Sequence, residues 1–373
     1  MALETNNLLN FYVENRISPV SQNIDDIDLH FHRRTGLYRA LGLAPSLFKD
    51  RDVLEVGPGS GHNSIVTATF GMKSYDLVEP NPAGFDKMVS LFGAHQVKNN
   101  AIQFFNVRLE DFPEEKNYDI VLCEGLIPGL SNQDTFLQQL ASKVRSGGIL
   151  VVTCADAVSV FFESLRRYLA RILVSRSDVN APNSGGAKRV ACMLADTFNS
   201  HLHSLKGMSR PVEDWVWDNL LNPASASLAA SNEFSIERCL NVLGDKFYFY
   251  GANPVFMDNW TWYKDLPRTP RDYNEPFVKS FTSQRHNFLH YQETSLPDST
   301  ASEIIYRCCK TFALQVEDRD PLALGDFTSE SIRKDLIPVR EVREIVGKCG
   351  LRQSEAAISE FAELFDEGKV PTS

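Results

Sequence analysis

Three alternate glycines follow a short apolar run near the start of the chain, in the stretch 53–63 with the sequence VLEVGPGSGHN. Gly57, Gly59 and Gly61 permit the positive φ angles of a tight turn and let main chain approach a ligand without a Cβ in the way. Glu55 stands two residues before the first glycine, and its carboxylate suits a cationic group better than a phosphate. The pattern predicts a strand that leads into a ligand-binding turn.

A second acid, Glu79, closes the apolar run 74–79 and stands twenty residues after Gly59. In nucleotide-binding α/β folds, an acid at this place accepts hydrogen bonds from ribose hydroxyls. A dinucleotide fingerprint, G-x-G-x-x-G, would need glycine where His62 stands, and Pro58 removes one N–H from a loop that would have to hold pyrophosphate. The residues therefore favour a nucleoside ligand other than a dinucleotide, with an NAD(P)-dependent oxidoreductase as the alternative.

The acid-x-Gly-x-Gly-x-Gly pattern resembles the first motif of the Rossmann-like, or class I, S-adenosylmethionine (SAM) dependent methyltransferases. The resemblance covers residues 50–155 well and residues 233–256 weakly. It implies SAM as the cofactor and in-line methyl transfer as the reaction. The residues that the resemblance places around SAM are Glu55, Gly57, Gly59, Gly61, Asn63, Glu79, Pro80, Leu109, Glu110, Cys123 and Gly125.

Candidate acid–base groups come from two separate parts of the chain. Glu124 follows the fourth predicted strand, and ligands in open α/β sheets sit beyond the carboxyl ends of strands near the topological switch. His30 and His32 precede the first strand, and an unperturbed histidine titrates near pH 6.5, about where a base is useful. We expect one of these histidines to take the acceptor's proton, Glu124 to orient the acceptor, and Arg33 or Arg34 to hold an anionic substrate group. The alternative is a solvated helix face, with proximity alone supplying the catalysis.

Strand and helix patterns alternate regularly between residues 51 and 155. Each predicted strand is a short apolar run, as expected when helices cover both faces of a sheet. Five such units imply a doubly wound parallel α/β sheet with right-handed crossovers. The family resemblance extends the expectation to seven mostly parallel strands, with the sixth at 246–250. The first five strands are predicted at 52–56, 74–79, 101–107, 118–123 and 148–154.

Additional helical sequence surrounds this core. Residues 158–232 interrupt it, and insertions at this edge of such sheets commonly form substrate lids. Arg210 and Trp215 of the insertion are the expected substrate contacts, while the C-terminal helices either cap the insertion or form a homodimer surface. The predicted units are an N-terminal helical cap at 1–50, a SAM-binding core at 51–157, the insertion at 158–232, a return to the sheet at 233–265 and a helical extension at 266–373.

The composition limits the classes of function. The 373 residues are 43% hydrophobic and carry a net charge of −10, which argues against a long nucleic-acid footprint. No apolar run approaches a membrane span, no signal peptide is evident, and no Cys or His spacing suggests a metal site. Seven scattered cysteines indicate reduced thiols and a cytoplasmic protein. We predict a methyltransferase that acts on an oxygen or nitrogen of a small or medium-sized acceptor, such as a sugar or a specialised metabolite. A non-catalytic SAM-fold binding protein is the remaining alternative.

Overall fold

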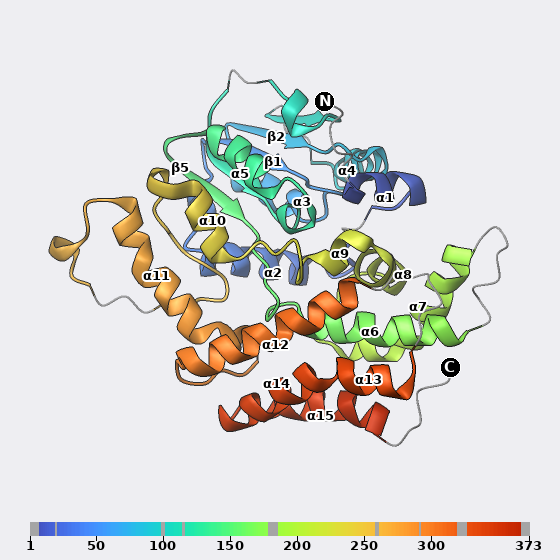
Figure 1. Cartoon of the computed structure of the whole chain (residues 1–373). Coiled ribbons are helices and arrows are strands. Elements are labelled where there is room, and N and C mark those ends of the chain that lie inside the picture. The colour runs from blue at the N-terminus through green and yellow to red at the C-terminus, as the bar shows by residue number, and fades with distance from the viewer. Residues whose placement is uncertain are drawn as a thin grey trace, which may run out of the picture.

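A single parallel sheet forms the core of the computed structural model, with the strand order β3-β2-β1-β4-β5. Helices cover both faces of this sheet, and a helical layer lies beyond the carboxyl ends of its strands, in the lower half of Figure 1. The strands are β1 (Asp52–Val56), β2 (Ser74–Val78), β3 (Ile102–Phe105), β4 (Tyr118–Cys123) and β5 (Val144–Val152). The structure describes residues 7–18, 21–97, 101–113, 116–177, 186–257, 261–290, 292–318 and 327–366.

The central strands are buried on both faces, which explains their continuous apolar sequence. In β1, Val53 packs into one hydrophobic cluster and the next residue, Leu54, into the cluster on the opposite face. The first cluster is covered by α2 (Ile27–Ala40), α3 (Ser64–Thr67) and α4 (Pro82–Ala94), and the second by α5 (Gln133–Ser142) and α10 (Ile236–Leu243). The doubly wound parallel α/β class is thereby confirmed.

The expectation of seven strands is not confirmed, because the sheet formed by the described residues has five. Residues 246–250 were the expected sixth strand, and they join no ladder. The buried side chain of Asn274 instead occupies their backbone groups: its amide oxygen accepts from the Phe249 N–H over 2.8 Å, and its amide nitrogen donates to the Phe247 carbonyl over 2.9 Å. Backbone groups taken by a side chain are not available to a neighbouring strand.

The fifth strand also differs from its prediction, because it begins at Val144 rather than at residue 148. α5 already ends at Ser142, so the Ser-Gly-Gly sequence lies inside the strand instead of stopping the helix. Gly147 has φ +75°, and the pairing of β5 with β4 shifts register between Tyr118 and Ile120. The glycines therefore accommodate an irregularity in the edge strand.

The remaining helices lie around α6 (Phe161–Arg176), which contributes to two further hydrophobic clusters. One side of α6 packs against the C-terminal helices, for example through Phe161 and Phe312, whose ring centroids are 6.1 Å apart. Its other side packs against the helices of the insertion. These further helices are α1 (Asn7–Asn15), α7 (Gly186–Ser204), α8 (Val212–Val216), α9 (Pro223–Ser227), α11 (Pro270–Gln284), α12 (Ser299–Glu317), α13 (Ser329–Asp335), α14 (Ile337–Lys348) and α15 (Arg352–Asp366).

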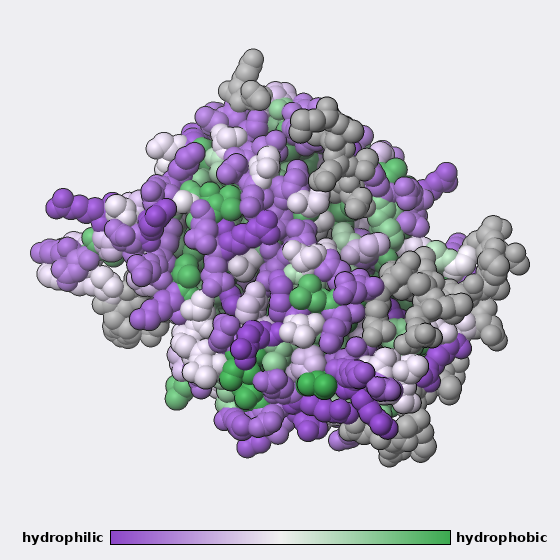
Figure 2. Space-filling view, in the orientation of Figure 1, coloured by the Kyte–Doolittle hydropathy of each residue, from purple (hydrophilic) through white to green (hydrophobic). Residues whose placement is uncertain are grey.

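On the face shown in Figure 2, the coloured residues are mainly hydrophilic, and hydrophobic residues form small, separate patches. Within the described ranges, no helix has both the length and the apolar composition needed to cross a bilayer. The same ranges hold no group of three or more His, Cys, Asp or Glu side chains arranged to bind a metal ion.

Candidate functional site

The glycine turn after β1 has the backbone geometry that its sequence predicts. Gly57, Gly59 and Gly61 have φ angles of +76°, +59° and +75°, which L side chains rarely adopt. A Cβ on Gly61 would lie 2.6 Å from Cγ of Met88, on α4. The third glycine is therefore required both for the turn and for the close packing of α4 against it.

Glu79 joins the end of β2 to this turn. One carboxylate oxygen accepts from the Gly59 N–H over 2.7 Å, and the other accepts from the Asn81 N–H over 2.8 Å. Burial raises the pKa of Glu79 to about 7, although the two backbone donors oppose the shift. The second acid is thus hydrogen-bonded to the glycine turn, and its contact with ribose hydroxyls stays a prediction.

Glu55 has different surroundings from those expected for a contact with a cationic ligand. Its oxygens accept hydrogen bonds from the hydroxyl of Ser64, over 2.9 Å, and from the hydroxyl of Tyr75. Burial, and then the charge of Glu124, raise the pKa of Glu55 to about 7. In this structure both oxygens are bonded to buried hydroxyls of the core, and a contact of Glu55 with the cofactor stays a prediction.

Glu124 is held by α2, which the sequence did not indicate. Arg34 Nη2 lies 2.8 Å from Glu124 Oε1, and the Tyr38 hydroxyl donates to the same oxygen over 2.9 Å. Burial works against the charge of Arg34, but the neighbouring Glu124 raises its pKa overall. Arg34 is therefore the partner of a protein carboxylate in this structure, and its contact with an anionic substrate group stays a prediction.

The two histidines of α2 lie on different sides of the helix. His30 is buried, and its Nε2 lies 2.7 Å from the backbone carbonyl oxygen of His62 in the glycine turn. Burial lowers the pKa of His30, against the effect of that hydrogen bond. His32 and Arg33 are exposed on the other side. His30 thus contacts the glycine turn, and the role of either histidine as a base stays a prediction.

The other predicted cofactor residues lie around the same edge of the sheet. Gly125, with φ +77°, donates its N–H to the hydroxyl of Thr153 over 2.9 Å. Cys123 is fully buried, and burial raises its pKa. Asn63 and Pro80 are half-buried beside the glycine turn and Glu79, respectively.

Leu109 and Glu110, which follow β3 and were expected around SAM, differ in exposure. Leu109 is buried in the cluster under α5, so only its main chain is a candidate contact. Glu110 is exposed and lies 3.5 Å from Arg108. The sequence missed Asn106, whose side-chain amide donates to the Glu79 carbonyl over 2.8 Å.

The insertion residues expected to bind substrate are engaged within the protein. Trp215 is buried in the cluster of α7 and α8, with its ring centroid 6.3 Å from that of Phe198, and its contact with a substrate stays a prediction. Arg210 pairs with Asp218 over 3.0 Å, and Asp218 also accepts from the Tyr12 hydroxyl over 2.6 Å. Arg210 thus belongs to a contact between the insertion and α1.

The segment that follows α1 lies against the cofactor edge, a placement that no local pattern predicted. Asn81 donates its side-chain amide to the Ile17 carbonyl over 3.0 Å. Ser18 is buried, and a Cβ on Gly84 would lie 3.4 Å from its hydroxyl and 3.2 Å from the carbonyl oxygen of Gly59. The Ser18 hydroxyl has no hydrogen-bond partner among the residues that the structure describes.

Comparisons with known proteins agree with this arrangement. Residues 30–182 match the family model described as "Methyltransferase domain". Two curated relatives, the "Ubiquinone biosynthesis O-methyltransferase" of Rickettsia bellii strains OSU 85-389 and RML369-C, are each 22% identical over 148 residues. Each match covers 38% of this chain and 53% of the relative, so the chain spans about half the length of the curated relatives it matches.

Two solved structures illustrate how far the likeness to known folds extends. The CcbJ methyltransferase from Streptomyces caelestis is 20% identical, covers 41% of this chain and 58% of its own, and gives a TM-score of 0.30. The N-terminal domain of EvdMO1 with S-adenosylhomocysteine (SAH) bound is 18% identical, covers 33% and 48%, and gives 0.27. Residues 30–182, which include the whole parallel sheet and the glycine turn, are thus similar to the methyltransferase domain family.

Proposed function

We propose that this protein binds SAM at the glycine turn and transfers its methyl group to an oxygen or nitrogen of a small or medium-sized acceptor. One observation carries the proposal: the Gly59 N–H donates to Glu79 over 2.7 Å, so that the turn after β1 and the acid after β2 meet. Glu124 follows β4, which pairs with β1 on its other side. Ligands of open α/β sheets bind at this edge.

The residues present fit SAM. Glu79 is a buried acceptor whose partners at Gly59 and Asn81 are backbone amides, and ribose hydroxyls are donors for the same oxygens. The buried Ser18 hydroxyl beside Gly84 lacks a partner among the described residues, as expected for an atom that faces a polar ligand. Bound SAM would supply an electrophilic methyl group on its sulfonium.

The protein's own residues then position the acceptor. Arg34 and Tyr38 both bond Oε1 of Glu124, and the described residues provide no hydrogen bond to Oε2. In our proposal, Oε2 accepts a hydrogen bond from the acceptor's O–H or N–H group and so orients the lone pair that attacks the methyl. Positioning of this kind can lower a barrier by about 7–11 kcal/mol.

The acceptor is proposed to be a small molecule rather than a nucleic acid, in keeping with the net charge of −10. A cytoplasmic location is also proposed, because all seven cysteines are free thiols. We also propose that the C-terminal helices form a homodimer surface.

A test of SAM binding uses two glycines near α4. Gly61→Ala places a methyl group 2.6 Å from Met88 at a φ of +75°, whereas a Cβ at Gly93, within α4, meets nothing within 4 Å. We expect Gly61→Ala to lower the SAM affinity at least tenfold in titration calorimetry, and the control Gly93→Ala to bind like the wild type. Circular dichroism of both variants checks that the fold is intact.

Three outcomes would count against the proposal. The first is wild-type SAM affinity in a folded Gly61→Ala protein, and the second is binding of NAD(H) in place of SAM. The third is SAM binding without methyl transfer to any component of a metabolite extract, measured with methyl-labelled SAM. That third result would favour the non-catalytic binding protein.

A further inference from the structure

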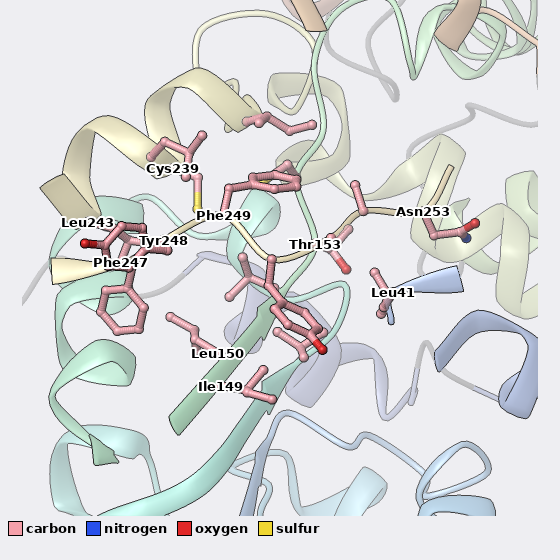
Figure 3. A pocket seen from close by; sticks show the side chains of 18 of the residues that line it. Leu41, Ile149, Leu150, Thr153, Cys239, Leu243, Phe247, Tyr248, Phe249 and Asn253 are labelled. Carbon is pink, nitrogen blue, oxygen red and sulfur yellow. The ribbon is translucent and has the colours of Figure 1, made fainter. Parts of the chain in front are cut away.

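A large cavity lies along the outer edge of β5, away from the glycine turn. Its volume is about 1010 Å³. Figure 3 shows its walls: Leu150 of β5 on one side, Cys239 and Leu243 of α10 above, and Phe247 and Phe249 of the extended segment 247–254 across from the strand. The cavity exists because this segment does not pair with β5, which remains the edge of the sheet.

The segment 247–254 is fixed at a distance from the strand by its other contacts. Asn274 of α11 occupies the backbone groups of Phe247 and Phe249. At the far end, the Tyr250 hydroxyl donates to the Gly42 carbonyl over 3.4 Å, and a Cβ on Gly251 would lie only 2.6 Å from the Leu41 carbonyl oxygen. The cavity wall is thus held by α11 and by the end of α2.

Apolar residues make up most of the cavity lining, with phenylalanine, leucine and cysteine side chains among them. Arg145, at the start of β5, and Lys246 also border the cavity. Glu124 and Thr153 line the end beside β4, where the Thr153 hydroxyl accepts the Gly125 N–H. Asp156 also borders the cavity, but Arg285 pairs with it over 3.2 Å. Arg34 and Arg285 compensate the charges of Glu124 and Asp156, so this end offers Glu124 Oε2 as a hydrogen-bond acceptor and favours a neutral hydrogen-bond donor.

We infer that this cavity is the acceptor site, and that the acceptor is an elongated, mainly apolar molecule whose hydroxyl-bearing end meets Glu124. The inference rests on the proposed methyl transfer, because Glu124 links the cavity to the edge where SAM is proposed to bind. Small-molecule sites are typically apolar pockets of roughly 300–1,000 Å³ with a few placed polar groups. A cavity at the upper end of that range suits a ligand with a long apolar body.

Alkylresorcinols provide a defined probe series, since each carries phenolic hydroxyls at one end and an apolar chain at the other. Full burial of a methylene group contributes about 0.8 kcal/mol, or roughly a tenfold gain in affinity for every two methylenes. We expect 4-hexylresorcinol to bind at least tenfold more tightly than 4-ethylresorcinol, measured by calorimetry on the full chain saturated with SAH. Resorcinol itself should bind most weakly.

A matched pair of tryptophan variants tests the location. Ala252 lines the cavity, whereas Val255, three residues later on the same segment, does not line it and is 66% exposed. Ala252→Trp should lower the affinity for 4-hexylresorcinol at least tenfold and leave the SAH affinity unchanged. Val255→Trp should leave both affinities unchanged.

The outcomes separate this inference from the function on which it rests. If SAH does not bind to the wild type, the proposed function fails and the acceptor site fails with it. If SAH binds but resorcinol affinity is independent of chain length, or is the same in Ala252→Trp and Val255→Trp, the acceptor inference alone is overturned. Chain-length dependence that is lost only in Ala252→Trp supports it.

Discussion

Three carboxylates near the carboxyl edge of the sheet differ because their partners differ. Glu79 accepts from two backbone amides and closes the glycine turn. Glu124 is paired with the cationic Arg34, which compensates its charge. Glu55 has only hydroxyl partners among its hydrogen bonds, in a fully buried position. Hydroxyl donors stabilise a buried charge less than a cation does, so the ionisation of Glu55 should oppose folding.

The raised pKa of Glu55 predicts a pH dependence of stability. Its ordinary value of 4.5 is raised to about 7 in the folded protein, chiefly by burial. Between these values the folded state retains a proton that the unfolded chain releases, so stability falls as pH rises through this window and levels off above it. The loss attributable to Glu55 is on the order of 3 kcal/mol.

Urea unfolding of the wild type and of Glu55→Gln at pH 5 and pH 8 measures this contribution. The free energy of unfolding should decrease less between the two pH values in Glu55→Gln, because the neutral amide cannot ionise. Glu79 also has a raised pKa, so a smaller decrease should persist in the variant. An equal decrease in both proteins would contradict the assignment.

Among the elements, the side chain of Asn274 explains why the expected sixth strand does not form. Asn274, on α11, is buried and bridges the Phe247 carbonyl and the Phe249 N–H. Phe249 then stacks on Phe277 of the same helix, with ring centroids 5.1 Å apart and planes 30° apart. The segment is therefore part of the α11 packing unit, which leaves the edge of β5 to the cavity.

We expect Asn274→Ala to destabilise this unit by about 2–3 kcal/mol, because two backbone groups lose their partners. The exposed neighbour Glu275 supplies the control, and Glu275→Ala should change stability by no more than about 0.5 kcal/mol. Denaturant unfolding gives the two values, and hydrogen exchange should show faster exchange of the Phe249 amide in Asn274→Ala only. Unchanged protection of that amide would mean that the segment is held by its aromatic contacts alone.

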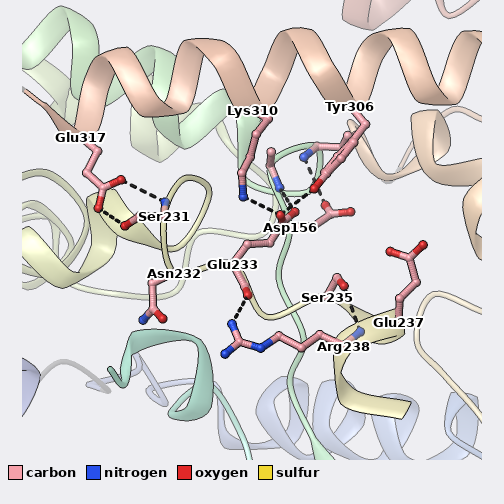
Figure 4. A network of polar contacts seen from close by, with 12 residues as sticks. Asp156, Ser231, Asn232, Glu233, Ser235, Glu237, Arg238, Tyr306, Lys310 and Glu317 are labelled. Atoms are coloured by element: carbon pink, nitrogen blue, oxygen red, sulfur yellow. Dashed lines mark hydrogen bonds and ion pairs between the residues drawn. The ribbon is translucent and has the colours of Figure 1, made fainter. Parts of the chain in front are cut away.

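At the scale of the whole molecule, a buried ionic cluster connects the sheet to the C-terminal helices. Figure 4 shows Glu233 accepting from Tyr306 and Lys310 of α12, over 2.8 and 2.7 Å. Beside it, Arg285 lies 3.2 Å from Asp156, just after β5, with side chains only 6% and 3% exposed. Charged residues between positions 285 and 310 thus hold the chain in place where it passes from β5 into α6.

Removal of the cation from this cluster should be costly. Arg285→Met leaves the buried Asp156 uncompensated, and we expect a loss of about 3 kcal/mol in the free energy of unfolding. The control is Arg271→Met, whose ion pair with Asp245 is exposed and should contribute less than about 1 kcal/mol. The double variant Arg285→Met with Asp156→Asn should recover part of the loss. A double variant as unstable as the sum of its single changes would show that the two charges do not interact.

Structural features that depend on neighbouring residues along the chain could be predicted from the sequence. The alternation of apolar strands and helices predicted the parallel α/β core, and the glycine spacing with Glu79 predicted the turn and its acid. These signals are local, because strand burial follows from continuous apolar residues and positive φ angles from glycine.

Contacts between polar groups that lie far apart along the chain depend on the tertiary structure. Arg34 is paired with Glu124 from 90 residues away, and Asn274 takes backbone groups 25 and 27 residues before it. Trp215 was expected at a substrate, yet the insertion buries it in its own core. A side chain's type shows what it can bond, but not which partner the fold brings within reach. The cavity that we infer to be the acceptor site also depends on the tertiary structure, because it lies where residues 246–250 do not pair with β5.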